Sequence, residues 1–352
     1  MYRTTPIGPL IREAGIPPAE TLLAARQLGY AVRLLGLPGN HLARQILPVS
    51  FRDGDQHAQP EDQPEGDMEW VERSARRQGP WSLGQQLAYQ LAGTIPINPS
   101  GGFEETVETS PASFPGQTKT LSTDQALKAA QEARPGLSLW SDGSRLENGQ
   151  VGAGIAWQKP QGVWQTREIP LGKGKEVFDA ELIGACRALE LALRLCGQGP
   201  VTILLDSQAA IARLQHRQPG PGQGLAIRAH QAARALEAQG RQVTIQWVPG
   251  HHGIEGNEKA DQAAKQAAKK TPQRGSGELS LAYVNRARTE VIWAHEQQWP
   301  TKALGRRSLE AQRVYRAQPG WRQDPVAAAA LKKIASRYYQ LKLGHAAIGT
   351  YL

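Results

Sequence analysis

Two aspartates follow directly on apolar runs that are typical of buried strands. Asp142 ends one of these runs, and Asp206 follows the second run, Val201–Leu205. Glu181 and Asp261 each lie in the first turns of a segment with the apolar spacing of an amphipathic helix. Functional sites of open α/β sheets form at the carboxyl ends of the strands. The sequence therefore predicts an α/β fold that gathers four carboxylates at one edge of its sheet.

The segment between residues 137 and 270 predicts the element order β-β-β-α-β-α-α-β-α. The pair Asn148-Gly149 is typical of a tight hairpin turn and separates the first two strands. We expect a mixed five-stranded sheet flanked by helices, about the size of one ordinary domain. The expected strands are 137–142, 151–158, 163–169, 201–205 and 243–248, and the expected helices are 176–196, 207–215, 224–239 and 255–270.

Composition divides the chain into four predicted parts. Residues 1–49 predict a helical connection segment, with one helix ending at Gly15, a longer one opened by Pro17-Pro18, and a third after Gly39. The remaining predicted parts are an acidic, Pro/Gly/Gln-rich linker, largely disordered, over residues 50–135, the α/β domain over 136–271, and a basic helical segment over 272–352.

The chain carries a formal net charge of +9, with a sequence pI of about 9.6, which favours a polyanionic partner such as nucleic acid. The two cysteines, Cys186 and Cys196, are expected to be core thiols, since no Cys-x-x-Cys pair suggests a zinc site. No segment has the length of apolar sequence that a membrane span needs, and the N-terminus lacks the pattern of a secretory signal. We expect an intracellular protein, and the sequence leaves nucleus or cytoplasm open.

Four carboxylates at one place repel one another unless cations compensate them. Mg²⁺ prefers oxygen ligands, and two such ions about 4 Å apart suit in-line phosphodiester hydrolysis. We therefore expect two Mg²⁺ ions on Asp142, Glu181, Asp206 and Asp261, with Mn²⁺ as a substitute and no small-molecule cofactor. Each of these acids taken alone is more typical of a surface or capping position, and only their joint placement favours the site.

The Gly/Pro-rich loop Val248–Gly253 contains two histidines after the fifth expected strand. An imidazole titrates near neutral pH, so a loop histidine can shuttle a proton or help to release the product phosphate. The spacing favours His251 over His252 for this role. The alternative is that the histidine stabilises the turn.

The motifs Asp-Gly-Ser at 142–144, Ala-Glu-Leu at 180–182, Asp-Ser-Gln-Ala-Ala at 206–210 and the run from Trp247 to Asp261 together resemble the type I ribonuclease H family. The likeness covers residues 137–270, and its nearest form is the domain attached to reverse transcriptases of fungal non-LTR retrotransposons. The resemblance implies that Asp142, Glu181, Asp206 and Asp261 are the metal-binding catalytic acids and that His251 is the accessory histidine. The neighbouring acids Asp179 and Glu258 fall outside the family's acidic set.

The flanks resemble the same retroelements. The stretch Thr4–Ala19 is similar to the connection after the polymerase, and Arg337–Lys342 with Gly344-His345-Ala346 is similar to the segment before a Cys/His motif. Neither a polymerase carboxylate signature nor downstream cysteines are present. We therefore expect a fragment of a retrotransposon polyprotein, with the missing polymerase part as a possible partner.

The resemblance implies an RNA–DNA hybrid as substrate, which a protein tells from duplex DNA by its 2′-hydroxyls and its groove shape. Candidate hydroxyl contacts are Gly143 and Ser144, and also Ser207 and Gln208, for which capping of the following helix is an equal alternative. Lys173 and Lys175 are candidates for phosphate contacts that fix position without reading sequence.

Two other functions fit parts of the pattern. A catalytically inactive nucleic-acid-binding remnant of a degenerate retroelement would keep the fold, although all four acids are present here. A DNA exonuclease or transposase of the same broad fold uses other spacings for the last acid and lacks the Pro-Gly-His loop. A hybrid ribonuclease is the function that the sequence favours.

Overall fold

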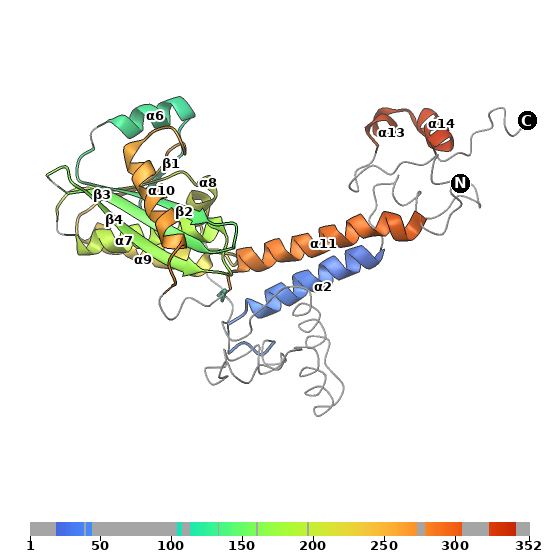
Figure 1. Cartoon of the computed structure of the whole chain (residues 1–352), viewed down its shortest axis with the longest axis horizontal. Coiled ribbons are helices and arrows are strands. Elements are labelled where there is room, and N and C mark those ends of the chain that lie inside the picture. Colours follow the sequence, from blue (N-terminus) through green and yellow to red (C-terminus); the bar gives the residue numbers. More distant parts are fainter. Residues whose placement is uncertain are drawn as a thin grey trace, which may run out of the picture. The chain divides into compact units, whose positions relative to one another are not determined.

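The computed structural model describes residues 19–38, 40–43, 104–107, 113–132, 134–159, 161–195, 197–272, 279–304 and 324–342. The chain divides into two compact units, one formed by residues 31–286 and the other by residues 1–30 together with 287–352. The expected sites all fall in the first unit. Figure 1 labels the elements of both units.

A six-stranded mixed sheet forms the centre of the unit of residues 31–286, with the strand order β1-β6-β5-β2-β3-β4. The middle of the chain makes an antiparallel meander of β2, β3 and β4, whereas β2, β5, β6 and β1 run parallel to one another. The meander turns at Gly149, whose φ of 82° is in the left-handed region that favours glycine. The strands are β1 (Gln117–Lys119), β2 (Leu137–Arg145), β3 (Val151–Gln158), β4 (Trp164–Gly172), β5 (Val201–Leu205) and β6 (Val243–Trp247).

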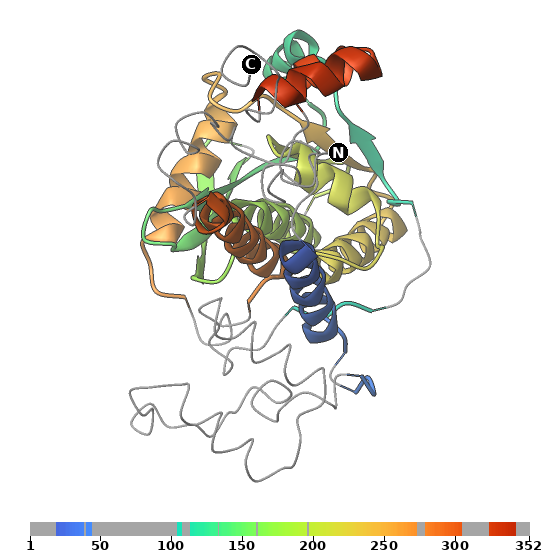
Figure 2. The same cartoon turned by 90° about the vertical axis from the view of Figure 1, so that its right-hand side faces the viewer.

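Helices cover both faces of the sheet. One face carries α7 (Val177–Arg194), α8 (Gln208–Gln215) and α9 (Gln223–Ala238), and the opposite face carries α10 (Glu255–Ala268) (Figures 1 and 2). Helix α6 (Thr123–Gln131) packs through Ala130 on the α10 side. Because β5 is covered on both faces, all five of its residues are buried, as its continuous apolar sequence predicts.

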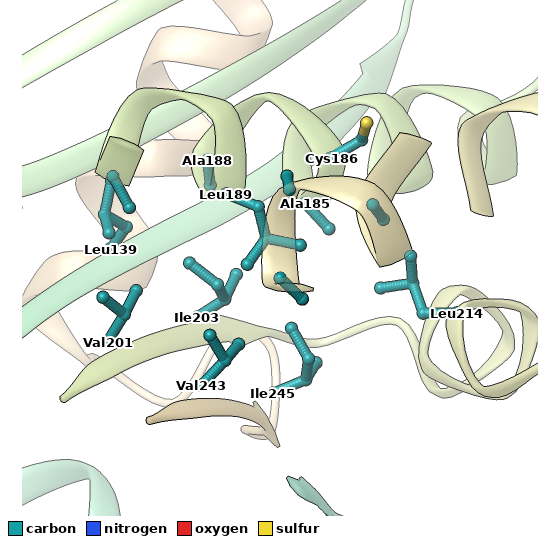
Figure 3. Packing of buried hydrophobic residues seen from close by; sticks show 14 of the residues in the cluster. Leu139, Ala185, Cys186, Ala188, Leu189, Val201, Ile203, Leu214, Val243 and Ile245 are labelled. Atoms are coloured by element: carbon teal, nitrogen blue, oxygen red, sulfur yellow. The ribbon is translucent and has the colours of Figure 1, made fainter. Parts of the chain in front are cut away.

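The main core lies between the sheet and the helices α7, α8 and α9. In Figure 3, Leu189 of α7 points toward Ile203 of β5 and Val243 of β6. Full burial of such a side chain contributes about 1.5–3 kcal/mol to stability. Cys186 is a buried free thiol in this core, as expected for one of the two cysteines, whereas Cys196 lies outside the described residues.

Helix α10 approaches the sheet closely because two residues of β3 facing it have no side chain. A Cβ atom at Gly154 would meet the backbone oxygen of Ala260, and one at Gly152 would lie 2.7 Å from the backbone oxygen of Ala264. This close approach brings α10, and with it Asp261, against the central strands.

Four further helices lie outside the α/β domain: α2 (Ala19–Leu35), α11 (Leu281–Leu304), α13 (Pro325–Ala329) and α14 (Lys332–Lys342). Asp324 caps α13 by accepting a hydrogen bond from the Val326 backbone N–H, and Tyr338 of α14 donates to the same carboxylate. Among the described helices, none combines the length and the apolar character needed to cross a bilayer.

The expected α/β fold with flanking helices is confirmed, but the expected number of five strands is wrong. The sixth strand, β1, pairs parallel with β6 and lies in the stretch that was predicted to be linker. Three polar residues, Gln117–Lys119, carry no apolar alternation, so the pattern gave no sign of a strand. The domain boundaries stay predictions.

Helix α2 corresponds to the helix expected after Pro17-Pro18. The expected helix ending at Gly15, most of the one expected after Gly39, and linker residues 50–103 lie outside the described residues.

We expect Gly154→Ala to lower the free energy of unfolding by about 1–3 kcal/mol, because the added methyl group must push α10 off the sheet. Gly224, at the start of α9, has open space around it and is the matched control. Gly224→Ala should leave stability unchanged or raise it by up to about 1 kcal/mol, since alanine favours a helix. Urea denaturation of both variants would measure this, and equal stability of the two would contradict the packing argument.

Candidate metal centre

Asp142 and Asp206 are neighbours because of the parallel register of β2 and β5. The last paired residues of these strands are Trp140 and Leu204, and each aspartate follows two residues later. Asp142 lies within β2 and pairs with Gly154, so this strand runs three residues beyond the expected end. The backbone register thus places the two carboxylates side by side.

Glu181 joins them from the first turns of α7. A Cβ at Gly143 would lie 2.7 Å from the Glu181 backbone nitrogen, so α7 can cross β2 this closely only at a glycine. Carboxylate oxygens of Asp142, Glu181 and Asp206 lie within 4.8 Å of one another. The backbone N–H of Gly143 donates to Oδ1 of Asp142 at 2.6 Å and fixes that carboxylate.

Burial and mutual repulsion favour the neutral forms of these acids. Asp142 and Glu181 are each only 5% exposed. Burial is the first cause that raises the pKa of Asp142, and the charge of Asp206 adds to it. Burial and the charge of Asp142 likewise raise the pKa of Glu181. The pKa of Asp206 is also raised by burial, although a hydrogen bond from its own backbone, the electrostatic interaction with His251 and a hydrogen bond from Asn257 act in the opposite direction.

The donor set fits a divalent cation. All ligand atoms of the cluster are carboxylate oxygens, which are the donors that Mg²⁺ and Ca²⁺ prefer. Glu181 Oε2 is buried and has no hydrogen-bond partner within the part of the chain that the structure describes. A buried polar oxygen without a partner is costly, and a cation would both satisfy it and offset the repulsion among the three acids.

Asp261 lies near the cluster but outside the group of three. It is buried on α10, where Lys265 holds its Oδ2 in an ion pair of 2.7 Å. Its charge raises the pKa values of both Asp142 and Asp206, which indicates that Asp261 lies close to these two acids. Whether it binds metal stays a prediction.

The Pro-Gly-His loop runs directly beside Asp206. A Cβ at Gly250 would meet Asp206 Oδ2, so the loop backbone touches the carboxylate. His251 is exposed, has a φ of 58°, and lies close enough to Asp206 to interact with it electrostatically. The Nδ1 atom of His252 lies 2.6 Å from the Gly250 carbonyl oxygen, which ties this histidine to its own turn. These contacts agree with the preference for His251, whose role stays a prediction.

Two residues outside the expected set of site residues hold Asp206. The indole Nε1 of Trp247 donates to the Asp206 carbonyl oxygen at 2.9 Å. Asn257 is 2% exposed and hydrogen-bonds the Asp206 carboxylate. The signal for Asn257 was present, because it precedes Asp261 by one helical turn on α10 and therefore shares its face.

The six candidate substrate contacts fall at three places. Gly143 and Ser144 are half-buried on β2 beside Asp142, and Gln208 is exposed at the start of α8. Ser207 caps α8, since its Oγ accepts a hydrogen bond from the Ala210 backbone N–H at 3.2 Å, as the capping alternative predicted. Exposed Lys173 and half-buried Lys175 lie in the connection from β4 to α7. Their contacts with a substrate stay predictions, and Asp179 and Glu258 do not belong to the cluster of three acids.

Comparison with known proteins finds one family model that matches the part of the chain around this site. Residues 134–269 match the family model RNase H. Among solved structures, the chain is similar to RNase H1 from the halophilic archaeon Halobacterium salinarum, at 21% identity over 38% of this chain and 98% of that chain, with a TM-score of 0.31.

It is also similar to the N-terminal RNase H domain of rv2228c from Mycobacterium tuberculosis, solved as a fusion with maltose-binding protein, at 21% identity over 38% of this chain and 98% of that chain, with a TM-score of 0.29. A third similar structure is the foamy viral protease-reverse transcriptase in complex with an RNA/DNA hybrid. It shares 18% identity over 47% of this chain and 23% of that chain, with a TM-score of 0.32.

The matched span contains all four expected acids and His251. The site therefore lies within the part of the chain, residues 134–269, that matches the RNase H family model.

Proposed function

We propose that this chain is an endoribonuclease that hydrolyses the RNA strand of RNA–DNA hybrids. The observation that carries the proposal is the cluster of Asp142, Glu181 and Asp206, whose oxygens lie within 4.8 Å inside the span that matches RNase H. Mutually repelling carboxylates, two of them buried, destabilise the fold, and a bound cation would explain why β2, α7 and the end of β5 bring them together.

Asp142, Glu181 and Asp206 would hold the cation, with Asp261 as a fourth ligand once Lys265 releases it. We propose two Mg²⁺ ions, for which Mn²⁺ would substitute. When bound, such ions supply an activated water and stabilise the leaving oxygen. The orphaned Oε2 of Glu181 supports this assignment, because it has no other partner among the described residues.

The other site residues would position the substrate and move protons. The imidazole of His251 would carry a proton toward or from the reacting phosphate, since its exposed loop adjoins Asp206. Gly143, Ser144, Ser207 and Gln208 would contact the hybrid near the scissile bond, and Lys173 and Lys175 would contact phosphates. We expect little sequence preference and products with 5′-phosphate and 3′-hydroxyl ends.

We propose further that the domain is the RNase H part of a retrotransposon reverse transcriptase and that it works inside the cell. The likeness of Thr4–Ala19 and Arg337–Lys342 to the flanks of such proteins supports this context. A polymerase part of the same polyprotein would then be its partner, because it makes the hybrid that this site would cleave.

We expect the full chain to release labelled RNA fragments from a hybrid in Mg²⁺ and to lose this activity in EDTA. Asp206→Asn should lower the rate by at least about 10²-fold, since it removes a charge from the cluster. Glu147→Gln, on the exposed turn between β2 and β3, is the matched control and should cleave like the wild type.

Equal cleavage of duplex DNA would contradict the proposed substrate. Absence of cleavage by a folded chain would favour the nucleic-acid-binding remnant. In that case gel-shift binding should persist and weaken steeply with salt, because lysine and arginine side chains displace counterions from the backbone.

Metal-free stability should depend on pH through the buried acids. The pKa values of Asp142 and Glu181 are raised in the folded protein. The contribution of these two acids to the free energy of unfolding is therefore fully present below the ordinary carboxyl pKa of about 4. It is lost as the pH rises through the raised pKa values. In EDTA, the Tm should fall from pH 5 to pH 8, and Mg²⁺ should raise it more at pH 8.

Asp142→Asn should flatten this pH dependence and raise the metal-free Tm at pH 8, because the amide cannot ionise. Glu147→Gln changes the net charge equally at an exposed position and should leave the dependence as it is. Differential scanning calorimetry would measure both. If Asp142→Asn instead lowers the metal-free Tm at pH 8, repulsion among the acids is not the dominant influence of Asp142 on stability.

A further inference from the structure

The entry of α7 is tied to segments that lie outside residues 134–269. Asp179, in the first turn of α7, is 2% exposed. Its Oδ2 accepts a hydrogen bond from the Glu176 backbone N–H at 2.7 Å and another from Ser280 Oγ at 2.5 Å. The carboxylate is thus satisfied by donors within the chain, which explains why this acid, two residues before Glu181, has a different role from the metal cluster.

Ser280 serves three contacts at once. Its Oγ donates to Asp179 and accepts from the Tyr283 backbone N–H at 3.1 Å, where α11 begins. Its own N–H donates to the Gly174 carbonyl oxygen at 3.0 Å, in the connection that leads into α7. The flanking residues Leu279 and Leu281 are buried, so the segment is packed against the domain as well as hydrogen-bonded to it.

Glu104, which precedes residues 134–269 in the sequence, forms hydrogen bonds with the same region. Its N–H donates to the Leu279 carbonyl oxygen at 2.9 Å, and its Oε2 accepts from the Leu281 N–H at 3.0 Å. Its Oε1 accepts from the N–H of Gly222, the residue that opens α9, at 2.6 Å. We call the set of Glu104, Glu176, Asp179, Ser280 and Arg286 the clasp, in which Arg286 Nε donates to Glu176 Oε1 at 2.7 Å.

The clasp adjoins the metal cluster through a rigid element. Glu181 follows Asp179 by two residues in the first turns of α7. The helix also presses on β2 at Gly143, where no room for even a Cβ exists next to the Glu181 nitrogen. A shift of the first turn of α7 therefore moves the Glu181 carboxylate relative to Asp142 instead of being absorbed by loose packing.

We infer that Asp179 and Ser280 are positioning residues that hold Glu181 in the cluster, so that chain segments outside the RNase H match complete the site. This inference rests on the proposed function. Neither residue touches the cluster, and neither is a catalytic residue. Through the hydrogen bonds of Glu104 and Ser280, the segments that flank residues 134–269 thereby influence the affinity of the cluster for metal.

The full chain should be compared as wild type, Ser280→Ala and Ser280→Thr, with Ser336→Ala on the exposed face of α14 as the matched control. The measurements are kcat and KM for hybrid cleavage, the Mg²⁺ concentration at half-maximal rate, and the rise in Tm that a fixed Mg²⁺ concentration causes. The last readout does not depend on activity.

We expect Ser280→Ala to need about tenfold more Mg²⁺, the scale on which outer partners of metal ligands act. The value of kcat should fall, KM for the hybrid should not change, and the Mg²⁺-induced rise in Tm should shrink. Ser280→Thr keeps the hydroxyl and should restore the Mg²⁺ requirement, and Ser336→Ala should match the wild type.

A Ser280→Ala chain with a lower Tm but wild-type kcat, Mg²⁺ requirement and Mg²⁺-induced shift would overturn the inference, because the clasp would then only stabilise the fold. Should that variant unfold below the assay temperature, Arg286→Gln loosens the clasp at its more exposed end and is judged by the same readouts. If the wild type binds Mg²⁺ but does not cleave, the proposed function fails, and the Mg²⁺-induced shift alone decides the inference.

Discussion

Electrostatic repulsion among Asp142, Glu181 and Asp206 is the constraint on which the arrangement of this domain depends. The three acids are carried by β2, α7 and the end of β5, and none of these elements can move away without losing the core beneath it. Leu139, Leu182 and Ile203 belong to that core and come from the same three elements. Burial of apolar side chains therefore offsets a repulsion that a looser fold would relieve by separating the charges.

Close contact between backbones makes the constraint effective. Gly143 lets α7 lie against β2, and Gly154 lets α10 lie against β3, so both helices that carry acids approach the sheet more closely than side chains would allow. At Gly250 the histidine loop touches the Asp206 carboxylate in the same manner. The site is thus defined by glycines at contact points as much as by the acids, and their replacement would act on geometry before it acts on charge.

Much of this could be predicted from the sequence, because strands buried on both faces and amphipathic helices leave clear periodic patterns. The strand Val201–Leu205 and the placement of Asp206 after it are examples. Strand β1 could not be predicted in this way, since its three polar residues owe their conformation to pairing with β6. Sequence motifs predict the acids of the cluster. The burial that favours the neutral form of Glu181 and the hydrogen bond from Trp247 to Asp206 depend instead on tertiary contacts. The hydrogen bond between Ser280 and Asp179 joins residues 101 positions apart, and no local pattern encodes it.

Strand β1 also changes how the sheet ends. Without it, the five-residue β6 would present its unpaired backbone groups as a template for another chain. With it, the outer strand on that side is only three residues long and ends in the exposed Lys119. Short edge strands and lysines on them both discourage strand addition between molecules. The appended strand thus gives the domain protection against self-association, a property separate from any chemistry at the metal cluster.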